Sequence, residues 1–177
     1  MNKGNARFDE TKLSALNAEY IRELASDVFA EKASSVLEAK GVNLAAIEQS
    51  YVRKVFELCQ GKVKSMDTLF DYVHYFFQDS YDFDAKGMQR IKKGVDPKVL
   101  LGELMPIFEG EAEYSSEVLE ASIQAIAEAN ERKIFAYFPV IRMATSGYTG
   151  GPDLLPMLSV MGRERVLPRL QSFLEKL

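Results

Sequence analysis

One arginine precedes a glycine-rich turn near the C-terminal end of the sequence. Arg142 ends an apolar run, and Gly150, Gly151 and Pro152 follow, with Leu154 just beyond them. Glycines let backbone groups approach a flat ligand closely, and a planar guanidinium can pair with such a ligand or stack on it. The alternative is a tight corner between two helices, in which the arginine pairs with an acid and the glycines cap a helix.

The other residue types that commonly carry chemistry do not form a site. The sequence has one histidine, His74, and one cysteine, Cys59, which cannot build a zinc site by themselves. It has no GxxxxGK[ST] loop and no GxGxxG turn after a strand. The acidic run DSYDFD at 79–84 lacks the central glycine and the closing glutamate of a calcium loop, so an inter-helix turn is the better interpretation. The residues by themselves predict no active site and no bound cofactor.

The composition is typical of a folded protein of one or two domains. Hydrophobic residues make up 47% and charged residues 27% of the 177 residues, and a single cysteine excludes an intrachain disulfide. The polar start MNKGNARFDE has no signal-peptide core, and no apolar run approaches the roughly 20 residues that a membrane-spanning helix needs. We therefore expect a cytoplasmic monomer that does not enter a membrane.

The charge is distributed unevenly along the chain. The net charge of −4 argues against a general nucleic-acid binder. From residue 131 onward, however, the sequence has seven basic and four acidic residues, whereas the preceding part has 15 basic and 22 acidic residues. This asymmetry allows a local basic face towards the C-terminal end.

The elements that must position Arg142 and its turn are helices. Apolar residues recur every three or four positions from residue 26 to 177. Ser26 or Asp27 is expected to cap the first of these helices, and Pro106 to kink or end the helix that begins near Pro97. The strand-like run KIFAYFPVI is interrupted by Pro139, and we expect a short helix or an irregular segment there. Helices are expected near 26–40, 44–60, 65–77, 84–93, 97–106, 115–127 and 166–177.

This pattern predicts an all-α protein, a helical bundle of two lobes that pack by ridges and grooves. The polar stretch FEGEAEYSS, residues 108 to 116, is the expected boundary. The lobes would then comprise residues 1–110 and 111–177.

Three segments in order carry a resemblance to a known family. The C-terminal stretch contains RMATSG, then GPDLL, then MGRERVLPRL. It resembles the end of bacterial-type glutamyl-tRNA synthetases, where Arg-x-Ala-x-(Thr/Ser)-Gly precedes (Ser/Thr)-Pro-x-Leu and a Leu-Gly-(Lys/Arg)-Glu-Arg run. RFDETKLSALNAEYIREL, residues 7 to 24, is similar to the segment that follows the catalytic core in that family. SMDTLFDYVHYFFQDSYDFD is similar to the aromatic stretch between its two helical lobes.

The resemblance implies an α-helical cage that binds an anticodon. Sequence-specific RNA recognition works on unstacked loop bases, by stacking and by hydrogen bonds to base edges. By this resemblance Arg142 would contact a base, Gly150 and Gly151 would admit it against backbone, and Pro152 and Leu154 would form an apolar wall. Lys62 and Lys64 are candidates for phosphate contacts, because they lie in a short polar turn at a helix start.

The chain departs from the family pattern at three places. Pro139 stands three residues before Arg142 instead of two, and Gly151 stands where a hydroxyl residue usually precedes the proline. Ser65 aligns with a position that is often arginine in enzymes that reject tRNA-Gln. We assign Ser65 to the anticodon-binding residues, and serine there indicates relaxed discrimination between tRNA-Glu and tRNA-Gln.

The resemblance also accounts for the missing chemistry. The His-x-Gly-His and Lys-Met-Ser-Lys type motifs, which serve ATP and magnesium in the full-length enzyme, do not occur here. The expected function is therefore to position tRNA-Glu for a catalytic domain of the same polypeptide. The chain would be a piece cut from a longer enzyme, which its start favours, or a freestanding non-catalytic relative. A helical protein-interaction or adaptor domain is the alternative from another class.

Overall fold

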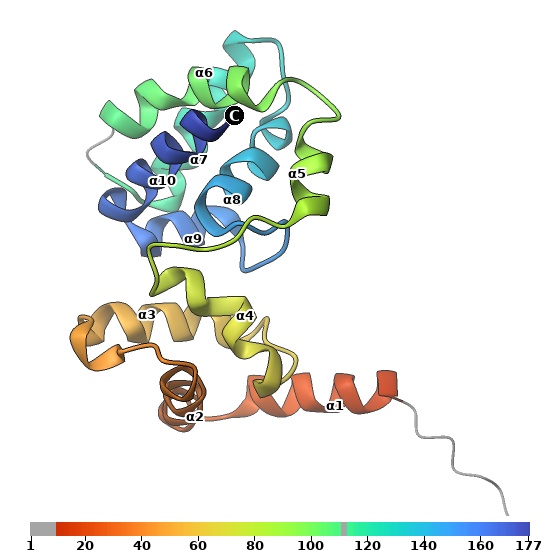
Figure 1. The fold of residues 1–177 in the computed structure, drawn as a ribbon, viewed down its shortest axis with the longest axis vertical. Coiled ribbons are helices and arrows are strands. Elements are labelled where there is room, and N and C mark those ends of the chain that lie inside the picture. The colour runs from red at the N-terminus through yellow and green to blue at the C-terminus, as the bar shows by residue number, and fades with distance from the viewer. Residues whose placement is uncertain (1–9, 111–112) are drawn as a thin grey trace, which may run out of the picture. The chain divides into compact units, whose positions relative to one another are not determined.

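The computed structural model describes residues 10–110 and 113–177, and its regular elements are all helices, with no strand in these ranges (Figure 1). The expected all-α fold is confirmed. None of the helices described is long and apolar enough to cross a membrane. The polar start at residues 1–9, and residues 111 and 112 of the expected boundary, lie outside the described residues.

The chain forms two compact units, residues 1–74 and 75–177. The division differs from the boundary that we expected near residue 110. The reason lies in the helix Pro97–Gly110, α6, which packs against the C-terminal helices and therefore belongs to the same unit as they do. A polar stretch in the sequence shows where the chain can turn, but not which helices share a core.

The first unit contains four α-helices in its described part, with two short 3-10 turns between them (Figure 1). The helix α2 packs against both α3 and α4. The buried core of this unit includes Phe29, Leu37, Val55, Leu69 and Val73. Gly41 follows α2 with a φ of +87°, as expected for a glycine stop. The elements are α1 (Glu10–Glu23), α2 (Ser26–Ala39), η1 (Leu44–Ala46), α3 (Gln49–Gln60), η2 (Met66–Thr68) and α4 (Leu69–Val73).

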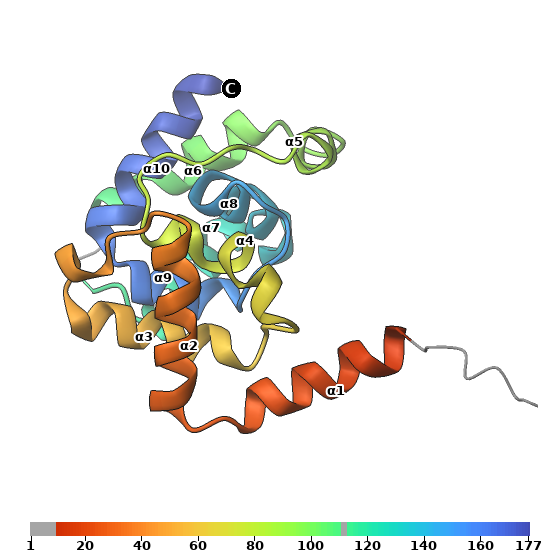
Figure 2. The same cartoon turned by 60° about the horizontal axis from the view of Figure 1, so that its bottom comes forward.

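The second unit is a helical bundle that includes the C-terminal helix (Figures 1 and 2). The helix α10 packs against α6, α8 and α9, and α7 packs against α6 and α9. Large side chains such as Phe108, Ile123, Tyr137 and Phe173 fill the space between them and are fully buried. The elements are α5 (Ala85–Ile91), α6, α7 (Ser116–Ala129), η4 (Ile134–Ala136), α8 (Phe138–Ser146), α9 (Leu154–Met161) and α10 (Arg163–Lys176). A short 3-10 turn, η3 (His74–Phe76), spans the division.

The structure corrects the expected cap of α2 and excludes one of the two effects expected of Pro106. The N-cap of α2 is Ala25, and neither Ser26 nor Asp27 caps it. Pro106 does not end α6, which continues to Gly110. Proline removes the hydrogen bond to the carbonyl of residue 102, but both positions are exposed, so water can satisfy that carbonyl while the opposite face stays packed.

Candidate nucleic-acid interface

The helix α8 carries Arg142 and ends at a glycine that no other residue could replace without rearrangement. Gly147 has a φ of +78°, and its N–H donates to the carbonyl of Met143 over 2.9 Å. A Cβ there would overlap the carbonyl oxygen of Asp82. The carbonyl of Gly147 accepts a hydrogen bond from the N–H of Asp84 over 2.8 Å. This end of α8 is therefore joined to the segment that leads into α5.

The guanidinium of Arg142 is bonded to the turn that follows it. Nη2 donates to the carbonyl oxygen of Pro152 over 2.8 Å, and Nη1 lies 3.9 Å from Sδ of Met157 on α9. The Arg142 side chain is partly buried, and Pro152 is buried. The hydrogen bond holds the guanidinium against the turn.

The two turn glycines differ in the space that surrounds them. Gly151 has a φ of +145°, and a Cβ there would lie 2.8 Å from Nη1 of Arg142 and 3.2 Å from the hydroxyl of Tyr75. At Gly150 an added Cβ would meet nothing within 4 Å. Gly151 thus leaves space for the arginine of the site. We had expected both glycines to leave space for a ligand, and this expectation stays a prediction for Gly150.

A groove of about 440 Å³ lies beside this arginine. Two of the residues expected in the site, Arg142 and Leu154, line it. Phe138 and Pro139 add apolar surface, and Arg90 from α5 adds a second guanidinium. Asp153 lines the groove as well and is an acid there. The groove thus combines an apolar lining with an excess of positive charge.

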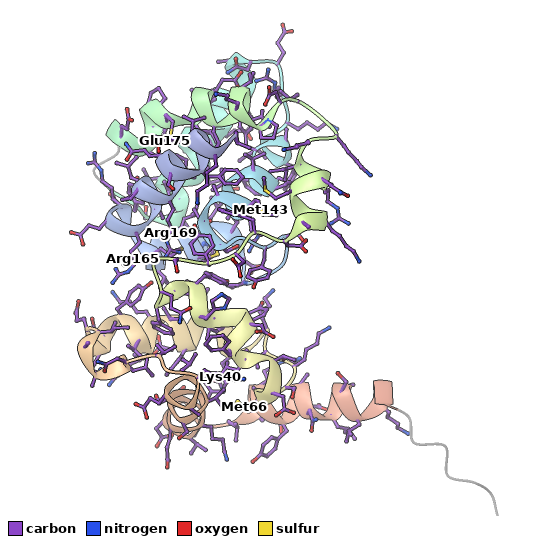
Figure 3. All side chains as sticks on the ribbon, viewed as in Figure 1. Lys40, Met66, Met143, Arg165, Arg169 and Glu175 are labelled. Atoms are coloured by element: carbon purple, nitrogen blue, oxygen red, sulfur yellow. The ribbon has the colours of Figure 1, made fainter. Side chains whose placement is uncertain are left out.

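A close approach of two helices brings Arg90 to the groove. Gly87 on α5 is buried, and a Cβ there would overlap Cε of Met143 and lie 2.8 Å from Cγ2 of Thr149. Met143 is on α8, one residue after Arg142 (Figure 3). Asp84 caps α5 by accepting a 2.6 Å hydrogen bond from the N–H of Gly87. This acid of the DSYDFD run therefore has the turn role that the sequence favoured.

A buried arginine on α10 supports the C-terminal end of α8. Arg169 is 8% exposed and donates to the carbonyls of Thr145, over 2.8 Å, and Gln78, over 3.0 Å. The hydroxyl of Tyr81 donates to the neighbouring carbonyl of Ala144 over 2.5 Å. The last carbonyls of a helix have no partner within it, and a cation near them is favourable. Arg169 and Tyr81 thus complete the helix end from outside.

Arg169 and Tyr81 also contact each other. The guanidinium carbon of Arg169 lies 4.9 Å from the centre of the Tyr81 ring. Burial raises the pKa of Tyr81 to about 12, although the charge and hydrogen bond of Arg169 act in the opposite direction. Arg165, one turn earlier on α10, is partly exposed, whereas Arg169 points inward (Figure 3).

The sequence motifs assign no role to Arg169, which the structure places on the buried side of α10. Its spacing from Val166, Leu170 and Phe173 put it at the edge of the buried stripe, and this signal could have been used. Arg90 and Phe138 were missed as well. Phe138 lies four residues before Arg142 on α8, a spacing that places both on one side of the helix. Nothing local marks Arg90, because the close packing of α5 on α8 brings it to the groove.

The remaining predicted residues belong to the first unit. Ser65 caps η2 by accepting a 3.3 Å hydrogen bond from the N–H of Asp67, as is common for a serine at the start of a helix. It also lines a hollow of about 240 Å³ with Tyr20, Lys32 and Met66. Lys62 and Lys64 are exposed in the turn before Ser65. Their side chains are therefore accessible to a phosphate.

Comparison with known families decides what kind of domain carries this groove. Residues 18–174 match a family described as "Anticodon binding domain". The chain belongs to this family. The resemblance to the C-terminal anticodon-binding region of glutamate–tRNA ligases, drawn from three short motifs, is thereby confirmed over nearly the whole length.

Curated relatives of this anticodon-binding domain are consistent with the family. Glutamate–tRNA ligase of Thermobifida fusca is 32% identical over 182 residues, covering 100% of this chain and 38% of the relative. Glutamate–tRNA ligase 2 of Caldicellulosiruptor saccharolyticus is 29% identical, covering 99% of this chain and 36% of the relative. The chain therefore spans little more than a third of the length of these relatives.

Solved structures share the fold of the domain. The crystal structure of a glutamate tRNA ligase from Elizabethkingia meningosepticum superposes with a TM-score of 0.80 at 21% identity, covering 100% of this chain and 34% of that one. Glutamate-tRNA synthetase from Elizabethkingia anophelis gives a TM-score of 0.76 at 19% identity. At these identities the likeness concerns the fold alone.

Proposed function

We propose that this domain recognises the anticodon loop of tRNA-Glu and positions the tRNA for a catalytic domain of the same polypeptide. The observation that carries the proposal is the groove beside Arg142, with a second arginine, an apolar lining and a guanidinium fixed by the carbonyl of Pro152. An unstacked base needs an apolar surface for its face and polar groups for its edge, and the RNA backbone needs positive charge. The groove supplies all of these.

In this proposal Arg142 selects a base, and the surrounding residues restrict the motion of the Arg142 side chain before the RNA binds. The hydrogen bond to Pro152 and the support of α8 by Arg169 reduce the motion that the guanidinium must lose on binding. Leu154 and Pro139 provide apolar surface for the base. Arg90 is placed to meet its edge or a neighbouring phosphate.

Ser65 is proposed to relax the choice between tRNA-Glu and tRNA-Gln. A serine offers a short side chain where the family often has arginine, and here its hydroxyl already accepts the N–H of Asp67. Without a guanidinium at this position, no fork of donors favours one base over another. We therefore propose that both tRNAs bind.

The chemistry of aminoacylation is assigned to the catalytic domain. We propose that ATP and magnesium act there, in the cytoplasm and on a monomeric enzyme. Among the residues that the structure describes, no three histidine, cysteine, aspartate or glutamate side chains gather as a metal site would require.

Titration of a fluorescently labelled tRNA-Glu anticodon stem-loop tests the proposal. The log of the binding constant should fall linearly with the log of the salt concentration, because phosphate contacts release counterions. A stem-loop with scrambled anticodon bases should bind more weakly, and the tRNA-Gln stem-loop should bind about as well as the cognate one. No binding at low salt, or equal binding of the scrambled loop, would overturn the proposal. An adaptor domain would bind neither stem-loop at any salt concentration.

A further inference from the structure

An aromatic ring stands in solvent beside the groove. Phe135, in the 3-10 turn η4 directly before α8, is 71% exposed. Its ring meets that of Phe138 edge to face, with ring centres 5.6 Å apart and planes at 82°. Phe138 lines the groove that also holds Arg142. The exposed ring of Phe135 therefore continues the apolar lining of the groove outward.

The backbone that presents Phe135 is anchored on both sides. Tyr137 is fully buried, and its hydroxyl donates to Oε2 of Glu103 on α6 over 2.7 Å. Arg132 forms an ion pair with the same carboxylate and donates to the Tyr137 hydroxyl over 3.3 Å. Within the turn, the N–H of Ala136 donates to the carbonyl of Lys133 over 2.9 Å. An exposed ring on an anchored turn is preorganised for a partner.

The charges around this ring identify the class of partner. Arg90 and Arg142 line the adjoining groove, and Lys133 is exposed two residues before Phe135. Asp153 is the acid among the groove-lining residues. An apolar ring next to an excess of cations fits a flat, anionic polymer, because nucleobases stack on aromatic faces while their phosphates meet the cations.

We propose that Phe135 is a stacking platform for an unstacked nucleobase of the bound RNA loop, adjacent to the base at Arg142. This inference rests on the proposed function and assigns a residue that the sequence motifs do not include. Every base has a face that can stack, so Phe135 contributes affinity with little dependence on sequence. Arg142 thus contributes sequence specificity, and Phe135 contributes affinity.

Substitutions at Phe135 separate stacking from simple apolar contact. Phe135→Ala should weaken binding of the cognate stem-loop on the order of 10-fold or more, equally for cognate and scrambled loops. Phe135→Leu keeps apolar volume but no aromatic face, and should lose nearly as much. Phe135→Tyr should bind like the unaltered chain. Because the side chain is exposed, melting should change little in any of these variants.

A fluorescence experiment reports on the ring itself. The chain has no tryptophan, so Phe135→Trp introduces a single tryptophan at the proposed platform, which can be excited at wavelengths where the tyrosines absorb little. Stacking of a base should quench its emission on titration with the unlabelled stem-loop. Val99→Trp on α6 is the matched control, since Val99 is 46% exposed and does not line the groove. Its emission should stay nearly constant.

The possible failures are distinguishable. If the unaltered chain does not bind the stem-loop, the proposed function fails and the platform fails with it. If the chain binds and Arg142→Ala weakens it, but Phe135→Ala binds normally or Phe135→Leu binds like the unaltered chain, only the stacking platform is wrong. Equal quenching of the Phe135→Trp and Val99→Trp proteins would also overturn it.

Discussion

Arg142 donates a hydrogen bond from Nη2 to the carbonyl oxygen of Pro152 over 2.8 Å. The two residues flank the turn that contains Gly150 and Gly151, so the bond fixes the guanidinium and the path of the turn together. The arginine that we propose for base recognition is therefore also part of the structure that holds the site. Loss of its side chain should affect binding and stability by separate and measurable amounts.

The first prediction concerns Arg142→Ala. It should weaken binding of the cognate stem-loop by about 1–3 kcal/mol, and the loss should depend on the anticodon sequence. Removal of the bond to Pro152 should also lower the stability by roughly 1 kcal/mol, which is a few degrees in melting temperature. One preparation serves for melting and for affinity. A lower melting temperature with unchanged affinity and selectivity would leave Arg142 a purely structural residue.

Gly151→Ala and Gly150→Ala form a matched pair. At Gly151 the new methyl group would crowd Nη1 of Arg142, and the φ of +145° is unfavourable for alanine. This variant should lose on the order of 1–3 kcal/mol of stability and should bind the stem-loop more weakly. At Gly150 nothing lies within 4 Å of the added atom, so folding should be nearly unchanged. Thermal melting of both variants checks this; similar melting would contradict the role given to Gly151.

Lys64→Ala tests a phosphate contact. Lys64 is exposed in the turn before Ser65, so its removal should not disturb folding. Binding of all stem-loops should weaken about equally, and the slope of log K against log salt should decrease by about one. Lys62→Ala provides the neighbouring comparison. An unchanged salt slope in both variants would remove these lysines from the interface.

Arg169→Met should destabilise the second unit. The substitution keeps an apolar stem of similar length, but it leaves the carbonyls of Thr145 and Gln78 without their buried donor. The expected loss is about 2–4 kcal/mol, since each unsatisfied buried group costs about 1–3 kcal/mol. Urea unfolding measures it, and Arg165→Met on the partly exposed side of α10 is the control. Equal effects of both substitutions would argue against the buried role of Arg169.

The pH dependence of stability should reveal Tyr81. Burial raises the pKa of Tyr81 to about 12, above the value of about 10 in unfolded chains. The folded protein therefore holds the phenolic proton more tightly, so this contribution is complete below pH 10 and declines as the pH rises towards 12. The decline should reach up to about 2 kcal/mol after allowance for partial exposure. Urea unfolding between pH 9 and 11 should show a steeper decline for the unaltered protein than for Tyr81→Phe.

The sequence determined the helical class, most helix positions and the family, because each depends on local information. Apolar residues every three or four positions specify helices whatever packs against them, and the Arg142 to Leu154 motif lies within one short segment. The cap at Ser65 and the glycine after α2 also depend on neighbouring residues alone.

The tertiary structure alone decided which residues meet. Arg169 bonds to Gln78, 91 positions away in the sequence, and α5 packs on α8 and carries Arg90 to the groove. The division of the chain between residues 74 and 75, and the continuation of α6 through Pro106, likewise depend on packing. Periodicity specifies which face of a helix is apolar, but not which other helix covers that face. The composition of a groove between helices is fixed only when the helices have packed.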